Sequence, residues 1–235
     1  PPYHVTRVIL IIVALGTMAY LAIQPAAAWL LVKQGNSAQA EHDNMSAIKW
    51  YRYASMADPG ATAVRDGLAR LCIQRFRETG VPEWLEQAAS EMAVAMALNP
   101  LDGRLPYRLG TIYLLQAEQP TLAVYRESLN ARAVLAFEKS ISVDPFSPFG
   151  YFELSKLYRG KGDRTSAQEL LERAITYEPN FLPARMALVD LAQETGQTDV
   201  ANMHSTAIKT IRWKYQGWTL SSLEQQFLAI QRQKS

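Results

Sequence analysis

The fold is decided by residues 148–180, which read PFGYFELSKLYRGKGDRTSAQELLERAITYEPN. The second half of this stretch places an alanine, a large apolar residue, a small residue and a proline at fixed spacing: Ala167, Leu171, Ala174 and Pro179. Steps of four and three residues keep the first three side chains on one helical face, where the small ones let a neighbouring helix approach closely. The proline then ends the connection into another helix. The stretch therefore predicts a packed pair of helices.

The same spacing occurs four times along the chain, which identifies it as a repeat. In every copy the first alanine and the proline are 12 residues apart. The other three copies are Ala47, Tyr51, Ala54 and Pro59; Ala88, Met92, Ala95 and Pro100; and Ala133, Phe137, Ser140 and Pro145. Each proline follows a polar residue, in chain order Asp58, Asn99, Asp144 and Glu178.

This pattern resembles the second helix of the tetratricopeptide repeat (TPR) family, and the first helices can be compared with it. The best copy runs from about Pro148 to Asn180 and has, at the signature positions of the first helix, Tyr151, Leu154 and Tyr158. The copy before it has Leu109, Gly110 and Tyr113 there. A fifth copy begins at Leu182 and fades after Met203, as a capping unit does.

Two copies are longer than the 34 residues that separate Pro145 from Pro179, since the earlier proline intervals are 41 and 45 residues. In the second copy, residues 80–82 mark the turn, which makes its first helix, about Thr62 to Thr79, long. In the third, the extra residues fall between Gln116 and Asn130. They either lengthen both helices or form a loop around Pro120.

A stretch of 25 residues without a charge, from Val8 to Val32, precedes the repeats. As a helix it would extend roughly 37 Å, which is enough to cross a hydrocarbon core of about 30 Å. Pro25 predicts that the membrane helix ends or bends there, which leaves residues 5–24 as the span. A cleavable signal peptide with Ala26–Ala28 as its small-residue site, and a buried core helix, are the alternatives.

The sequence therefore predicts an all-α protein: an N-terminal transmembrane helix followed by a right-handed TPR-like α-solenoid with C-terminal capping helices. The expected parts are an anchor over residues 1–28, about five helix pairs over 29–205, and capping helices over 206–235, formed by Thr206 to Tyr215 and Leu220 to Arg232. The first pair, from about Trp29, could be continuous with the membrane segment. We expect a single-pass membrane protein of the bacterial inner membrane. The repeats are placed on the extracytoplasmic side, although Arg7 and Lys33 on the two flanks leave the orientation open.

The composition argues against catalysis and nucleic-acid binding. The net charge is +2, with acids and bases spread along the chain, so no broad basic face is expected. The three histidines lack the spacing of a metal site, and no phosphate loop or nucleophile motif is present. The single cysteine, Cys72, lies in an apolar helical stretch and is interpreted as a buried small hydrophobe. We expect no enzyme activity, no cofactor, no metal and no small-molecule substrate.

The resemblance implies a concave surface lined by outward-pointing residues of the first helices, suited to a peptide or a helix of another protein. These residues are Arg104, Tyr107, Thr111 and Leu114 in the third copy, Phe152, Lys156 and Arg159 in the fourth, and Met186 and Asp190 in the fifth. Their aromatic and cationic character favours an acidic or C-terminal peptide segment. The alternative is that some of them are only solvated or are covered by the C-terminal helices.

The function that fits is a membrane-anchored scaffold or assembly subunit, with other proteins of a membrane complex as partners and membrane contact through residues 5–24. A second hypothesis rests on the helix that runs through residues 25–29 into repeats, which looks like the C-terminal interaction tail of bacterial O-antigen ligase or polymerase-like proteins. A third is a secreted repeat protein with a cleavable signal.

Overall fold

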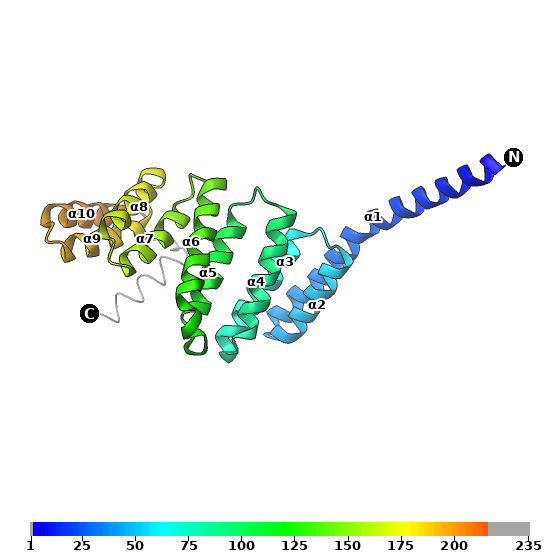
Figure 1. The fold of residues 1–235 in the computed structure, drawn as a ribbon, viewed down its shortest axis with the longest axis horizontal. Coiled ribbons are helices and arrows are strands. Elements are labelled where there is room, and N and C mark those ends of the chain that lie inside the picture. The colour runs from blue at the N-terminus through cyan, green and yellow to red at the C-terminus, as the bar shows by residue number, and fades with distance from the viewer. Residues whose placement is uncertain (1, 216–235) are drawn as a thin grey trace. The chain divides into compact units, whose positions relative to one another are not determined.

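The structure is a computed structural model that describes residues 2–215, apart from the side chains of residues 2–5, 20 and 21 (Figure 1). Over these residues the chain forms helices and turns without a strand, as the sequence predicts. It divides into two compact units, unit 1 over Pro1–Arg126 and unit 2 over Glu127–Ser235. Each unit is described by itself.

Unit 1 is built from antiparallel helix pairs, α1 with α2 and α3 with α4, followed by α5 and a short 3-10 helix, η1. The bounds are Pro2–Ala40 for α1, Asn44–Ala57 for α2, Thr62–Thr79 for α3, Glu83–Leu98 for α4, Arg104–Ala117 for α5 and Pro120–Tyr125 for η1. The long first helix of the second copy is confirmed, and its end is set by Gly80, whose φ of 70° is the left-handed conformation that glycine adopts readily.

Unit 2 continues the same construction. Its helices are α6 (Arg126–Val143), α7 (Pro148–Gly160), α8 (Arg164–Tyr177), α9 (Leu182–Glu194) and α10 (Thr198–Lys214). The extra residues of the third copy form η1 and lengthen its second helix, α6, while α5 keeps ordinary length. The sequence prediction of a separate helix from Thr206 is wrong, because α10 runs unbroken from Thr198 to Lys214. The predicted helix from Leu220 to Arg232 lies outside the described residues.

The recurring alanine, large and small positions form the core of both units, as the spacing predicts. All twelve side chains at these positions are less than 9 % exposed, and those of Ala47, Ala88 and Ala133 are fully buried. The residue before the proline directly follows each of these helices, with a φ of −129° at Asp58 and Glu178 and −135° at Asn99. Its N–H donates to the carbonyl of the repeat's small residue, for example from Asp58 to Ala54 at 3.0 Å. One short sequence therefore sets both the packing face and the helix end.

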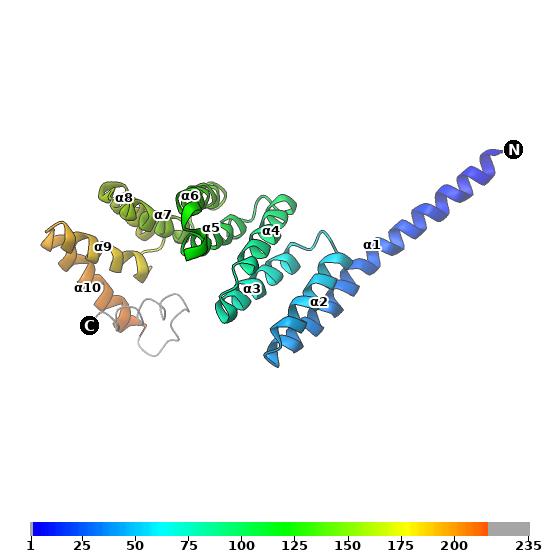
Figure 2. The ribbon, with the colours of Figure 1, turned by 60° about the horizontal axis from the view of Figure 1, so that its bottom comes forward.

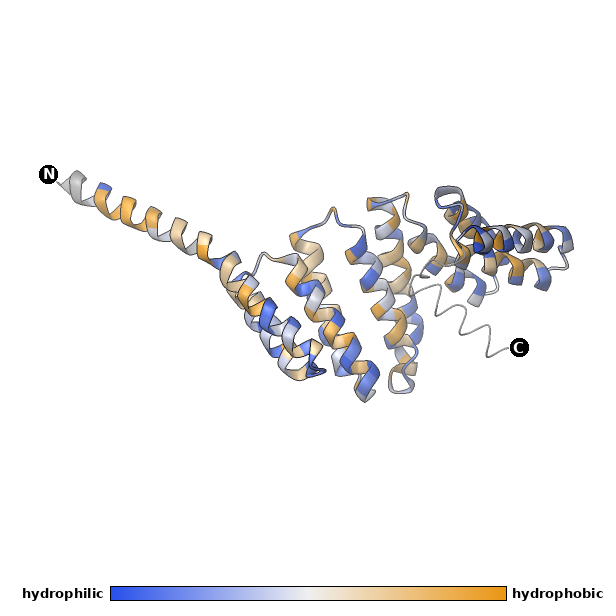
Figure 3. Ribbon diagram, turned by 180° about the vertical axis from the view of Figure 1, so that it is seen from behind, coloured by the Kyte–Doolittle hydropathy of each residue, from blue (hydrophilic) through white to orange (hydrophobic). Residues whose placement is uncertain are grey.

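Helix α1 joins the predicted membrane segment to the first repeat without a break. It runs from Pro2 to Ala40 and contains Pro25 inside it, so the helix does not end at the proline. Its part after Ala28 packs along α2, whereas the apolar residues before it lie exposed, and Figures 1 and 3 show this segment extending beyond α2 as a hydrophobic helix. This helix, from Thr6 to Ala40, is the one in the described part of the chain that is long and apolar enough to cross a membrane.

Tyr51 of α2 packs between the first repeat and the second. Its ring lies between two glycines, because a Cβ on Gly35 of α1 would approach Tyr51 Cδ2 to 2.7 Å and a Cβ on Gly67 of α3 would overlap the other ring edge. The Tyr51 hydroxyl donates a hydrogen bond to Asn36 Oδ1 at 2.7 Å. Three successive helices therefore meet at one buried aromatic ring.

We predict that Gly67→Ala destabilises α2 and α3, although alanine is ordinarily the better helix former by up to about 1 kcal/mol. The added methyl group has to displace the Tyr51 ring, and overpacking of this kind costs about 1–3 kcal/mol. Amide hydrogen exchange in α2 and α3 measures the effect as faster exchange. Gly160→Ala is the matched control, since a Cβ there meets no atom within 4 Å. Equal protection in the two variants would contradict this packing.

Candidate partner-binding surface

The groove residues predicted on α5 belong to unit 1 and share one side of their helix. Arg104 is exposed, while Tyr107, Thr111 and Leu114 are half-buried, so all four reach the surface. The Thr111 hydroxyl donates to the Tyr107 carbonyl at 3.1 Å, which keeps this side chain close to the helix. The arrangement offers a strip of one aromatic, one aliphatic and one cationic side chain.

The five predicted groove residues of unit 2 separate into two groups. Lys156 is exposed, and Arg159 and Asp190 are half-buried. Phe152 and Met186, in contrast, are 2 % and 5 % exposed, so the expectation that they point outward is wrong.

Phe152 and Met186 are buried because α9 supplies more core than a single helical face provides. Phe152 stacks edge-to-face on Phe181, the N-cap residue just before α9, with ring centroids 5.7 Å apart. Helix α9 packs against both α8 and α10, and it buries Met186 together with its neighbours Leu182, Pro183 and Ala184. The accessible part of the predicted groove in unit 2 is therefore polar.

The three cations of the predicted groove are each paired with a carboxylate. Arg104 donates to Asp102 through Nε at 2.9 Å and Nη2 at 2.7 Å. Lys156 Nζ lies 2.7 Å from Glu153 Oε2, and Arg159 pairs with Glu194. These hydrogen bonds hold the pKa of Asp102 and of Glu194 below the usual value. The groove cations thus carry no surplus charge that would select an acidic peptide.

The sequence prediction did not include these three acidic partners, of which two are local in the sequence and one is distant. Glu153 is three residues before Lys156 and Asp102 is two before Arg104, so both are local pairs that helix spacing and turn chemistry could have indicated. Glu194 is 35 residues after Arg159 and lies on the next first helix. Only the repeat period brings such a pair together.

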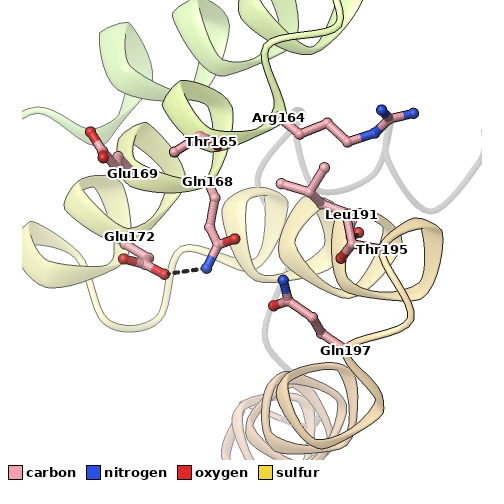
Figure 4. Close-up of a pocket in the computed structure, with 8 residues that line it drawn as sticks. All are labelled: Arg164, Thr165, Gln168, Glu169, Glu172, Leu191, Thr195 and Gln197. Atoms are coloured by element: carbon pink, nitrogen blue, oxygen red, sulfur yellow. Dashed lines mark hydrogen bonds between the residues drawn. The ribbon is translucent and has the colours of Figure 1, made fainter.

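Unit 2 also contains a pocket of about 300 Å³ that the sequence did not indicate (Figure 4). Its lining comes from α8 and from the end of α9 with the following turn: Arg164, Thr165, Gln168, Glu169, Glu172, Leu191, Thr195 and Gln197. Gln168 donates from Nε2 to Glu172 Oε1 at 2.8 Å across one wall. Leu191 is the one aliphatic residue of the lining, so the pocket fits a polar segment better than an apolar side chain.

The buried ionisable groups are placed for packing. Burial raises the pKa of the Cys72 thiol to about 12, so the thiol stays protonated, as expected of a buried small hydrophobe. His204 of α10 is 3 % exposed, and its Nδ1 lies 3.4 Å from Arg185 Nη1 of α9. Burial and then the Arg185 charge lower the pKa of His204 below 6.5, with Glu172 of α8 opposing them. Within the described residues, no three or more histidine, cysteine, aspartate and glutamate side chains gather as a metal site would require.

Comparison with known proteins supports the repeat. Residues 150–181, which span α7 and α8, match the tetratricopeptide repeat family. The fold is a TPR-like α-solenoid. Comparison with curated protein sequences gives no match.

Solved structures agree at the level of fold. A MamA structure from Desulfovibrio magneticus RS-1 is 14 % identical and superimposes with a TM-score of 0.61, over 81 % of this chain and 98 % of that one. A thermophilic TPR protein of Thermus thermophilus is 18 % identical, with a TM-score of 0.57 over 80 % and 97 % of the two chains. PilW, a type IV pilus biogenesis factor, is 16 % identical, with a TM-score of 0.56 over 78 % and 77 %. Such identities show a shared fold alone.

We predict that the stability of unit 2 decreases as the pH falls below about 6.5. The unfolded chain binds a proton at His204 near the ordinary histidine pKa, whereas the folded pKa is lower, so the stability present at neutral pH is lost as the pH falls towards the folded pKa. Hydrogen exchange in α9 and α10 at a series of pH values, corrected for intrinsic rates, measures this loss.

His204→Gln should flatten this pH dependence. His42→Asn is the control, because His42 lies exposed in the turn after α1, where its φ of 61° also suits asparagine. A pH dependence that survives in His204→Gln would assign it to other groups.

Proposed function

We propose that this chain is a membrane-anchored TPR scaffold or assembly subunit that holds other proteins within a larger membrane complex. The observation that carries the proposal is the continuity of α1, which is at once an exposed apolar helix and the first helix of the repeats. A protein-binding solenoid built directly onto such a helix serves to hold partners at a membrane.

The anchor is supported by the surroundings of α1. Large apolar residues from Val8 to Met18 are 54 to 69 % exposed, which water would penalise and a hydrocarbon core would not. A signal sequence has the same composition, so retention has to be argued separately. It is favoured by Ala28, which is 3 % exposed, because a cut after Ala28 would fall inside the packed part of the first helix pair.

The binding surface is supported by the first helices. In unit 1 the strip on α5 carries Tyr107 and Leu114, two side chains suited to apolar contact with a partner. In unit 2 the exposed Lys156 and the half-buried Arg159 and Asp190 offer polar contacts, and the nearby pocket offers hydrogen-bonding groups. With its cations already paired, this surface fits an uncharged or mixed-charge segment of another protein.

Membrane extraction tests the anchor. We predict that the chain stays in the pellet when membranes are washed at alkaline pH, and that the mature mass includes residues 2–28. Release into the wash with a mass that begins at Trp29 would instead establish a secreted repeat protein. Further membrane spans joined to this chain would favour the tail of an O-antigen ligase or polymerase-like protein.

Photo-crosslinking tests the binding surface. We predict that a photoreactive phenylalanine analogue at position 107 or 156 traps discrete protein adducts in native membranes. Tyr107 is half-buried and aromatic, and Lys156 is exposed, so both positions accept the probe. Glu138, exposed on the second helix α6, is the control position. Uncrosslinked monomer at both test positions, or equal labelling at Glu138, would contradict the assignment.

A further inference from the structure

The turns of unit 1 lie at two opposite ends of its helices. Helix α2 runs back along α1, with Tyr51 packed against Gly35. At about 1.5 Å per residue, the end of α2 at Ala57 therefore lies roughly level with Trp29, where the membrane segment joins the repeat. The α2–α3 turn and the α4–α5 turn share this end, as Figure 2 shows. We call it the anchor edge of unit 1, comprising residues 56–62 and 98–104.

The anchor edge carries exposed apolar side chains beside Asp58 and the paired Asp102 and Arg104. Leu101, in the α4–α5 turn, is 84 % exposed, and Met56 and Leu98, at the ends of their helices, are 72 % and 45 % exposed. Such residues are unfavourable in water and gain from any apolar surroundings.

On α1 and α2, the helices of the first pair, lysines lie over aromatic rings. Lys33 Nζ lies 5.7 Å from the Trp29 ring centroid on α1, and Lys49 Nζ lies 5.9 Å from that of Tyr53 on α2. Tryptophan, tyrosine and lysine are the side chains that favour the layer between lipid tails and water. Lys33 and Lys49 also give this end a charge that attracts anionic headgroups.

The opposite edge of unit 1 has a different character. Its turns, after α1, α3 and α5, and the adjoining helix ends carry exposed carboxylates: Glu41, Asp43, Glu78, Glu83, Glu86 and Glu118. Val81 adds an apolar side chain to these turns, and it is 40 % exposed, less than half as much as Leu101. An acidic edge of this kind is repelled by an anionic membrane surface.

We propose that the anchor edge of unit 1 rests on the lipid headgroup layer of the membrane that α1 crosses. This inference builds on the proposed membrane anchor. The uncharged run of α1 reaches Val32, so the bilayer surface falls near Trp29, level with the end of α2. Because α1 continues into the repeat without a linker, the turns are held at the surface and Leu101 and Met56 enter the interface. The membrane then covers the exposed apolar side chains of the anchor edge, and the acidic edge faces away from it.

The test uses the full chain in vesicles of phosphatidylethanolamine and phosphatidylglycerol, with an environment-sensitive fluorophore on a single introduced cysteine. The positions are Leu101→Cys on the anchor edge, Val81→Cys on the opposite edge and Val13→Cys in α1. The native Cys72 is fully buried and stays unlabelled under folding conditions. Quenching is measured with nitroxides on the lipid headgroups and on the middle of the lipid tails.

We expect the label at position 101 to be quenched by headgroup nitroxides several-fold more strongly than the label at position 81, and the label at position 13 by tail nitroxides. Equal quenching at 101 and 81, with position 13 quenched, would overturn the edge contact and leave the anchor intact. A label at 101 that is shielded from both headgroup nitroxides and an aqueous quencher would assign this edge to a protein partner and would also overturn the proposal. Absence of quenching at position 13 would remove the anchor itself.

Discussion

Close approach of neighbouring helices at small residues is the constraint on which the rest of the structure depends. Ala47, Ala88, Ala133 and Ala167, at most 1 % exposed, mark the places where a second helix meets its neighbours. A larger side chain would separate the helices and expose the large residue one turn later. The first repeat needs the smallest residue of all, because the Tyr51 ring fits only where Gly35 and Gly67 have no side chain. Stability therefore comes from contacts between adjacent repeats, as in other solenoids.

The repeat period also organises the polar contacts. Several side-chain hydrogen bonds join residues 35 positions apart, such as Gln39 to Gln74 and Arg52 to Gln87 in unit 1 and Arg159 to Glu194 in unit 2. Each of these three joins equivalent helices of successive repeats. These hydrogen bonds fix the register of equivalent helices in neighbouring repeats. Apolar contacts between alanine and leucine alone would let those helices slide along each other.

The sequence predicted the helix pairs well because their spacing records a packing requirement. Positions such as Ala95 and Leu171 have one structural role, and that role is visible as a period of four and three residues. The candidate binding surface was harder to predict, since it consists of the side chains that the packing face does not use. Phe152 was expected outside because it lies off the repeat face, but Phe181, just before the next first helix, covers it. The length of α10 was missed for a related reason: Ile211 continues its buried side after the repeat pattern has faded.

The continuity of α1 also has a mechanical meaning. A flexible linker would let the repeats sample many directions, whereas an unbroken helix couples the rotation and tilt of its apolar N-terminal segment to the first helix pair. Pro25 lies inside α1 and lacks the N–H that would donate to the preceding turn, so bending concentrates there. Helix α1 therefore transmits motion along its length and bends mainly at Pro25. Through it, forces on the apolar N-terminal segment and loads on the repeats act on each other directly.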